Sequence, residues 1–207
     1  MKVTNERWIT MSFNDSRPSI HAKQIGKGRW TTAYADRDSR HVYLFVAVRP
    51  DGGTDYAKEL IADIGGGNLH IPRVERFDEI DGTVGDRFRV YKSERYLPLT
   101  AKCGSAWTQF KQLRKIAEEE VRAANVRQAG QRVAPQGYEV MERIIERVRV
   151  APKATTELVE ALELLRDATM NYGSNWWFEF AKRNCAVDAY GSLILLDCVF
   201  DQDQIEP

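Results

Sequence analysis

Three side chains near the end of the sequence have types and spacing that could do chemistry. Glu179 carries a carboxylate that could accept a proton from a substrate. Asn184 follows five residues later, and Asp197 stands beyond two short apolar runs joined at residues 189–191, which predict a β-hairpin with a tight turn. The spacing leaves two interpretations open. Either these residues form one site, or they are a junction Glu, a surface Asn and an Asp that caps a turn.

A second group could bind phosphate. In the stretch "IGKGRWTTAYAD", Gly26 and Gly28 flank Lys27. Because glycine has no Cβ atom, its backbone can approach a phosphate closely and direct N–H groups at it. Gly-x-Gly turns also join strands that bind nothing. Lys27 accordingly either supplies positive charge to a site or is an ordinary solvated lysine.

The first half of the chain predicts an antiparallel sheet interrupted by one helix. The run "HVYLFVAV" is rich in β-branched and aromatic residues, and Pro50 and the Gly52-Gly53 turn close it. Thr54 is a suitable helix cap, and apolar residues recur at helical spacing from there to residue 64. The expected strands are residues 19–25, 30–36, 41–48, 69–78 and one or two within 87–99.

The second half predicts helices. Apolar stripes of helical period, with charged residues opposite, run through residues 105–128, 137–150 and 155–172. We interpret the Glu and Arg runs as solvated faces. The fold class expected is α+β in two lobes. Residues 1–18 form an N-terminal extension, residues 19–99 a strand-rich lobe with one helix, and residues 100–207 a helix-rich lobe with a terminal hairpin.

Composition excludes several classes of function. Thirty basic residues balance thirty acidic ones among 207, so no overall attraction to nucleic acid or membrane is expected. No apolar run approaches the roughly 20 residues that span a bilayer, and the N-terminus is too polar for a signal peptide. No Gly-x-Ser-x-Gly elbow occurs. We therefore expect a cytoplasmic protein whose partner is recognised locally.

Cysteine and histidine spacing gives no metal site. The three cysteines lack CxxC or Cys/His spacing, which favours buried free thiols in a reducing compartment. The three histidines lie far apart, so each is expected on the surface or in the core. These residues are Cys103, Cys185 and Cys198, and His21, His41 and His70.

Together these stretches resemble the protein kinase family. "IGKGRWTTAYAD" is similar to its glycine-rich loop, "YAKELIADI" to its αC helix, "LHIPRVERF" to the entry into its fourth strand, and "VYKSERYLPL" to its hinge. The similarity spans residues 19 to about 201. Within the family, the order of elements resembles the early host-takeover protein kinases of short-tailed coliphages.

The resemblance implies ATP and magnesium as ligands. Asn184 and Asp197 match the Asn and Asp that hold the magnesium bridging the ATP phosphates. Gly26, Lys27 and Gly28 match the phosphate-covering loop, and Glu59 matches the carboxylate of the αC helix. Host cytoplasm is the implied location for a viral protein of this kind.

Three departures from the family pattern bear on catalysis. Strand 41–48 has no Lys to hold the phosphates, and Leu44 takes that position. Arg49 at the end of the strand, or Lys27 from the glycine-rich stretch, would have to supply the charge instead. Glu179 stands where the family has Asp, and its extra methylene shifts the oxygen by about a bond length. The sequence ends about ten residues after Asp197, and no activation segment or substrate-binding helical subdomain is expected.

Three functions follow as alternatives. The first is a degenerate kinase-like protein, or pseudokinase, that binds a host macromolecule, with or without bound nucleotide, through the helices of residues 105–171. The second is a minimal active Ser/Thr protein kinase in which Glu179 positions or deprotonates the hydroxyl. The third is an unrelated α+β interaction protein. A host protein is the expected partner, and nucleic acid is not.

Overall fold

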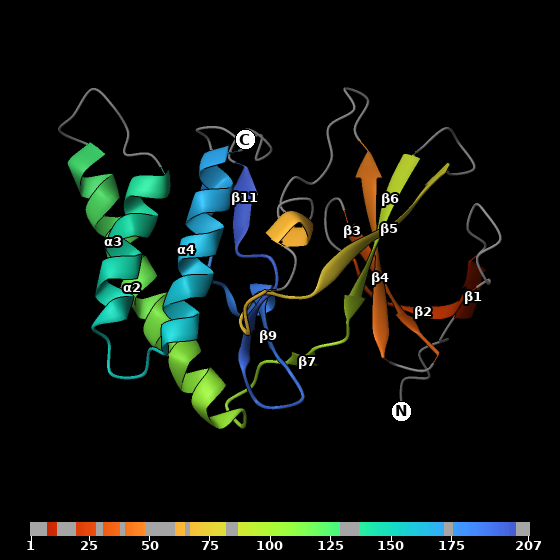
Figure 1. The fold of residues 1–207 in the computed structure, drawn as a ribbon, viewed down its shortest axis with the longest axis horizontal. Helices are drawn as coiled ribbons and strands as arrows, with labels where there is room; N and C mark the ends of the chain where they lie inside the picture. Colours follow the sequence, from red (N-terminus) through yellow and green to blue (C-terminus); the bar gives the residue numbers. More distant parts are fainter. Residues whose placement is uncertain are drawn as a thin grey trace. The chain divides into compact units, whose positions relative to one another are not determined.

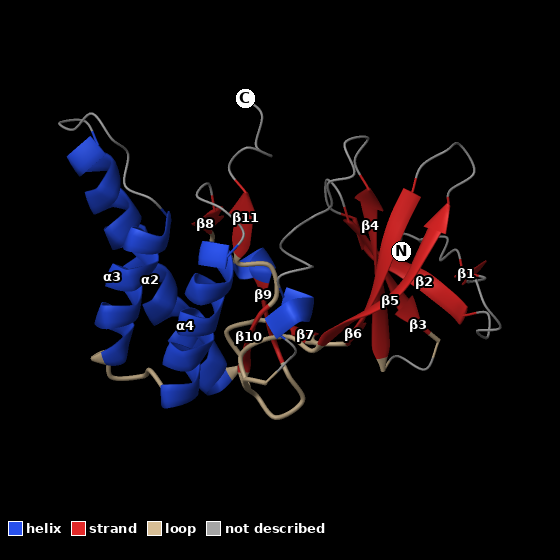
Figure 2. Cartoon of the chain, turned by 45° about the horizontal axis from the view of Figure 1, so that its top comes forward, coloured by secondary structure: helices blue, strands red, loops and turns tan. Residues whose placement is uncertain are grey.

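The computed structural model is a mixed α+β protein (Figures 1 and 2). It describes residues 8–11, 20–27, 31–37, 40–48, 61–64, 67–81, 87–128, 137–171 and 176–201. The chain divides into two compact units. Unit 1 comprises Met1–Gly65 and Arg73–Arg95, and unit 2 comprises Gly66–Pro72 and Tyr96–Pro207. The expected boundary at residue 99 therefore differs from the observed one by a few residues, and a short segment before β5 belongs to the second unit.

Unit 1 is built on a six-stranded antiparallel sheet in the order β1-β2-β3-β4-β6-β5. Its strands are β1 Trp8–Met11, β2 Ile20–Lys27, β3 Thr31–Asp36, β4 His41–Val48, β5 Val74–Asp81 and β6 Arg87–Glu94. Residues 61–64, between β4 and β5, are helical as expected. Residues 8–11, expected as part of an extension, instead add an edge strand because they pair with β2.

Strand β4 shows why the run "HVYLFVAV" folds as a central strand. Tyr43 and Phe45 are buried in one cluster with Ala22 and Val90. Successive side chains of a strand alternate between faces, so Val46, which is fully buried, lies on the opposite face. A strand covered on both sides needs apolar residues at consecutive positions, which explains the continuous apolar sequence.

Unit 2 contains three helices at the predicted places: α2 Gly104–Gln128, α3 Gly137–Arg149 and α4 Thr156–Asn171. Thr155 caps α4, because its Oγ1 accepts a hydrogen bond from the N–H of Leu158 at 3.2 Å. The first residue of α3 packs closely on the chain after α4. A Cβ atom at Gly137 would lie only 1.8 Å from the carbonyl oxygen of Trp176.

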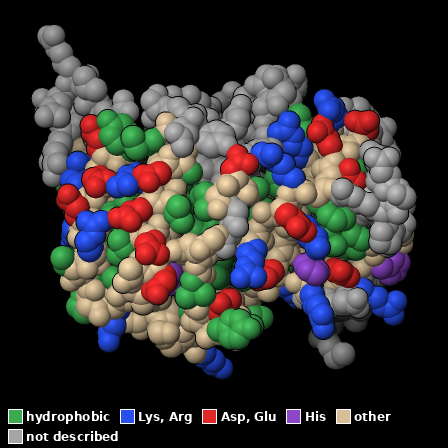
Figure 3. Space-filling model, viewed as in Figure 1, with side chains coloured by type: hydrophobic (Ala, Val, Ile, Leu, Met, Phe, Trp, Pro, Cys, Tyr) green, Lys and Arg blue, Asp and Glu red, His purple; other side chains and the backbone are tan. Residues whose placement is uncertain are grey.

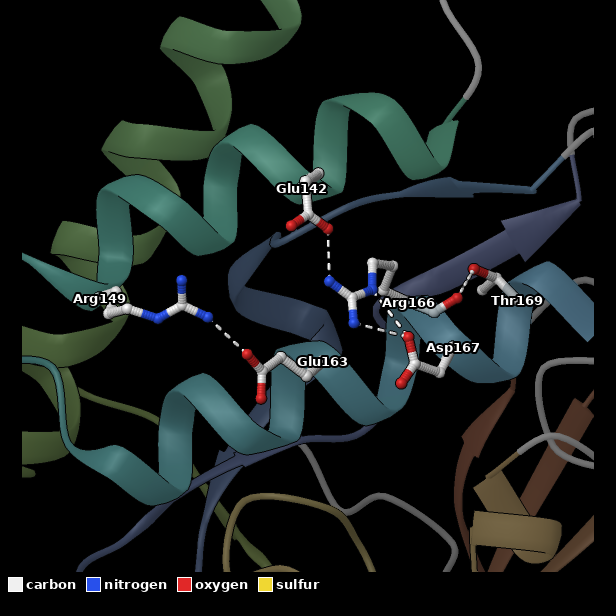
Figure 4. A network of polar contacts seen from close by, with 6 residues as sticks. All are labelled: Glu142, Arg149, Glu163, Arg166, Asp167 and Thr169. Carbon is white, nitrogen blue, oxygen red and sulfur yellow. Dashed lines mark hydrogen bonds and ion pairs between the residues drawn. The ribbon is translucent and has the colours of Figure 1, made fainter.

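The charged residues of α3 and α4 do more than face solvent. Basic and acidic side chains alternate over the helices in Figure 3, and several join one helix to another. Figure 4 shows Arg166 of α4 between Glu142 of α3 and its own neighbour Asp167, with Arg149 reaching Glu163 at 2.6 Å. Such partly exposed pairs each contribute about 0 to 1 kcal/mol to stability. The solvated-face interpretation is therefore incomplete, since these side chains also link the helices.

The Arg147 guanidinium makes a further link, from α3 to α2. It donates to Glu119 at 2.5 Å and to Glu120 at 2.9 Å. The hydrogen bond from Arg147 lowers the pKa of the Glu119 carboxyl. The pair is therefore charged at neutral pH, which keeps α2 and α3 together on their polar sides.

Two small sheets complete unit 2. One has the order β10-β9-β7, formed by β7 Leu97–Pro98, β9 Cys185–Val187 and β10 Leu193–Leu195. The other pairs β8 Trp176–Phe178 with β11 Val199–Asp201. The hairpin of β9 and β10 was predicted, whereas the pairing of β8 with β11 was not. Within the part of the chain that the structure describes, none of the helices combines the length and apolarity required to cross a bilayer.

His70 anchors residues 67–72 inside unit 2. Its ring is 2% exposed, Nδ1 donates to the carbonyl oxygen of Leu193 at 2.6 Å, and Nε2 accepts from Thr155 Oγ1 at 3.3 Å. The backbone oxygen of His70 also accepts from the N–H of Leu195 at 2.9 Å. Burial lowers the pKa of His70, so the ring is neutral at pH 7. His70 is therefore a core histidine, one of the two interpretations that the sequence left open.

Candidate functional site

The Asn184 side chain is joined to Glu179 across one turn of chain. Its Nδ2 donates to the backbone oxygen of Glu179 at 3.1 Å and to Glu179 Oε2 at 3.0 Å. Between them lies the 3-10 helix Lys182–Asn184, and the N–H of Asn184 donates to the carbonyl of Ala181 at 2.9 Å. Both hydrogens of the amide are thus used on Glu179. Among the described residues, none donates to Asn184 Oδ1.

The backbone oxygen of Asn184 ties the same residue to the far end of the hairpin. It accepts from the N–H of Leu196 at 2.9 Å and of Asp197 at 3.3 Å, and from Cys198 Sγ at 3.4 Å. Burial, with the neighbouring Cys185 thiol at 3.9 Å, raises the pKa of Cys198 well above its usual value, so it remains a protonated donor. These three contacts hold the backbone N–H of Asp197 next to the backbone oxygen of Asn184.

The hairpin between them is fixed by its turn. The carboxylate of Asp188 accepts from the N–H groups of Tyr190 and Ser192 at 2.9 and 2.7 Å. Gly191 has φ +88°, a conformation that favours glycine. Cys185 pairs with Leu195 across the strands. The turn lies at residues 189–191, as the sequence predicted, and Asn184 and Asp197 flank the hairpin.

Glu179 is held from three directions. Arg183 Nη2 donates to its two carboxylate oxygens at 2.6 and 2.7 Å, Asn184 donates to Oε2, and the N–H of Glu179 donates to the carbonyl of Cys198 at 2.9 Å. The last contact continues the β8–β11 pairing. Sequence reasoning missed Arg183, although its spacing of four residues from Glu179 is the signal of an ion pair on one turn. A carboxylate has about four acceptor sites, so one remains for a further proton donor.

Asn184 Oδ1 and the Asp197 carboxylate are oxygen atoms of the kind that bind magnesium. Mg²⁺ is usually held by one or two side-chain oxygens plus substrate phosphates and water. Asn184 Oδ1 has no donor among the described residues, and the Asp197 side chain is exposed. No group of three or more His, Cys, Asp or Glu lies together in the described ranges. If magnesium binds here, Asn184 and Asp197 would supply its side-chain ligands, and phosphate and water would supply the others.

The remaining predicted residues lie in unit 1, or outside the described residues in the case of Gly28 and Glu59. Gly26 and Lys27 are at the end of β2, where they pair with Ala33 and Thr32 after a register shift. A Cβ atom at Gly26 would lie 3.8 Å from Ala33 Cβ, an ordinary contact, so the strand itself does not require glycine there. Lys27 is exposed.

Leu44 occupies the middle of β4, between Ala33 of β3 and Tyr91 of β6. The described strand 41–48 contains no basic side chain other than His41 at its start. β4 thus has no equivalent of the lysine that the sequence resemblance to protein kinases would call for on this strand.

No family model matches the chain, and a search of curated proteins finds no similar sequence.

Proposed function

We propose that the protein is a degenerate kinase-like protein that binds ATP with magnesium and acts by binding a host macromolecule in the cytoplasm. The observation that carries the nucleotide part is the Asn184 amide. Both of its hydrogens are donated to Glu179, so its Oδ1 oxygen could bind a magnesium ion. The backbone N–H of Asp197 is hydrogen-bonded to the backbone oxygen of the same Asn184. Asn184 and Asp197 would hold the magnesium ion, whose charge would neutralise that of the nucleotide phosphates.

The state of Glu179 favours binding over catalysis. A general base must accept the substrate proton, yet contacts from Arg183 and Asn184 take three of the roughly four acceptor sites of Glu179 and pair its charge with a guanidinium. Strand β4 also lacks the cation that would hold the α and β phosphates. These two features support a pseudokinase, and the resemblance to phage host-takeover kinases is the basis for proposing a host partner.

A thermal-shift titration with ATP and Mg²⁺ tests the nucleotide part. A ligand that binds only the native state stabilises it by about 2.7 kcal/mol at 100 times its Kd, which raises the Tm by several degrees. We expect a rise that requires Mg²⁺ and is lost in Asn184→Ala and in Asp197→Ala. Glu160→Ala, which removes an exposed carboxylate of α4, is the matched control and should keep the rise. No rise at millimolar nucleotide would leave the unrelated interaction protein as the better hypothesis.

A minimal active Ser/Thr kinase is the second candidate, and one contact favours it. Asn184 holds Glu179 Oε2 at 3.0 Å, so a carboxylate lies beside the proposed metal ligand where a base would act. Transfer of labelled phosphate from ATP to a protein substrate would be the measurement. If transfer occurs and Glu179→Gln abolishes it while ATP still raises the Tm, the enzyme is active and the pseudokinase proposal fails.

A further inference from the structure

A groove of about 700 Å³ runs along Glu179 within unit 2. One wall is a face of α2, and the other is the chain from Phe178 to Arg183. Arg114, Glu118 and Arg122 are spaced by four residues, so they share that helix face. Val121 and Phe178 are apolar lining residues of the groove, and we refer to them as its floor. We refer to the charged side chains that line it as its rims.

Positive charge exceeds negative charge on these rims. Four cations face two carboxylates, and the six side chains are Arg114, Arg122, Lys182, Arg183, Glu118 and Glu179. The two carboxylates are already used, because Arg114 pairs with Glu118 at 2.6 Å and Arg183 with Glu179 at 2.6 Å. Among the described residues, no carboxylate lies within ion-pair distance of Arg122 or Lys182. Two exposed cations therefore remain, and each can bind a separate acidic group of one ligand.

Lys182 is positioned by an aromatic ring. Its Nζ lies 5.9 Å from the centre of the Trp107 ring, and that ring lies 5.5 Å from Phe110. A cation at this distance from an indole is attracted to the ring without losing its charge. Lys182 can therefore bind an anion while its stem is held against α2.

We infer that this groove binds an acidic segment of a partner protein. Carboxylates of such a segment would pair with Arg122 and Lys182, and its apolar side chains would contact the floor. A nucleic acid fits less well, since a row of phosphates needs many cations and would meet Glu118 and Glu179. The groove borders Glu179, and the inference that it binds a partner protein rests on the proposed function.

The test is fluorescence anisotropy of the full chain with a short labelled peptide rich in Asp and Glu, without nucleotide. Because ATP is absent, this result is independent of the thermal-shift titration. We expect binding that weakens as salt rises, because exposed charge pairs are screened. Arg122→Glu combined with Lys182→Glu should weaken it by about tenfold or more, since like charges then face each other.

A matched pair controls for overall charge. Lys111→Glu combined with Lys153→Glu makes the same charge change at two exposed lysines of unit 2 outside the groove, and should leave binding within about twofold. Equal loss in both double variants, or no binding of the acidic peptide, would overturn the inference. Tighter binding of a single-stranded oligonucleotide, lost in the groove variant, would instead assign the groove to nucleic acid. Tm values of both double variants close to that of the unaltered protein would show that both are folded.

Discussion

Replacing Asn184 by Ala removes the two hydrogen bonds that hold Glu179. One goes to a neutral backbone oxygen and is worth about 1 kcal/mol, and one goes to a carboxylate and is worth about 1.5 to 3 kcal/mol when buried. Asn184 and Glu179 are only half-buried, so the lower values apply. We expect a loss of about 2 kcal/mol in the free energy of unfolding of unit 2, and a fall in Tm of about 6 °C.

Asn184→Asp sharpens the test because it changes charge with almost no change of shape. The substitution places a second carboxyl group about 3 Å from Glu179 Oε2, and two carboxyl groups so close cannot both ionise without a cost in free energy. The folded state then binds a proton more tightly than the unfolded state. The variant should be least stable at neutral pH and should regain stability as the pH falls through the raised pKa of the carboxyl pair.

Urea denaturation followed by circular dichroism at several pH values measures both effects. Asn125→Ala, at an exposed Asn of α2 without a hydrogen bond among the described residues, is the control and should lie within about 0.5 kcal/mol of the parent. The reasoning is refuted if Asn184→Ala is as stable as Asn125→Ala, or if acid does not restore Asn184→Asp.

Three further predictions follow from other contacts. Burial lowers the pKa of His70, so the stability that the neutral ring contributes is complete above about pH 6.5 and is lost as the pH falls toward the lowered pKa. The urea midpoints at about pH 7.5 and 5.5 should therefore differ less in His70→Gln than in the unaltered protein. Hydrogen bonds from Thr100 lower the pKa of Cys103, whereas burial raises the pKa of Cys198. Iodoacetamide should therefore modify Cys103 first, as followed by mass spectrometry, and faster labelling of Cys198 would contradict this order. Gly137→Ala should cost about 3 kcal/mol or more because its Cβ would overlap a backbone oxygen, while Gly67→Ala, which meets open space, should change thermal stability little in the same calorimetric measurement.

The long elements were predictable because their own sequences carry the signal. The apolar run of β4 matched residues 41–48, and the stripes of α2, α3 and α4 located the helices to within about two residues. β1 and the β8–β11 pair were missed. Each of these strands has only three or four residues, and β8 pairs with a partner about 20 residues away, so no local pattern distinguishes them from apolar core segments.

Part of the candidate site was likewise predictable from the sequence, and part was not. The spacing of Glu179, Asn184 and Asp197 singled them out, and the structure brings the first two into contact and binds the backbone of the third. Their role in binding magnesium and nucleotide stays a prediction. The sequence could not predict the hydrogen-bond partners of these side chains. Asn184, for example, donates both amide hydrogens to Glu179, because the 3-10 helix Lys182–Asn184 turns back on that residue.

The division of the chain has a consequence for making fragments of it. The backbone leaves unit 1 after Gly65, returns at Arg73, and leaves again after Arg95. A fragment that starts at Tyr96 would therefore omit His70, and the acceptor oxygen of Leu193 and the hydroxyl of Thr155 would lose their buried partner. No single cut yields both units whole, so a fragment meant to contain all of unit 2 must join residues 66–72 to residues 96–207.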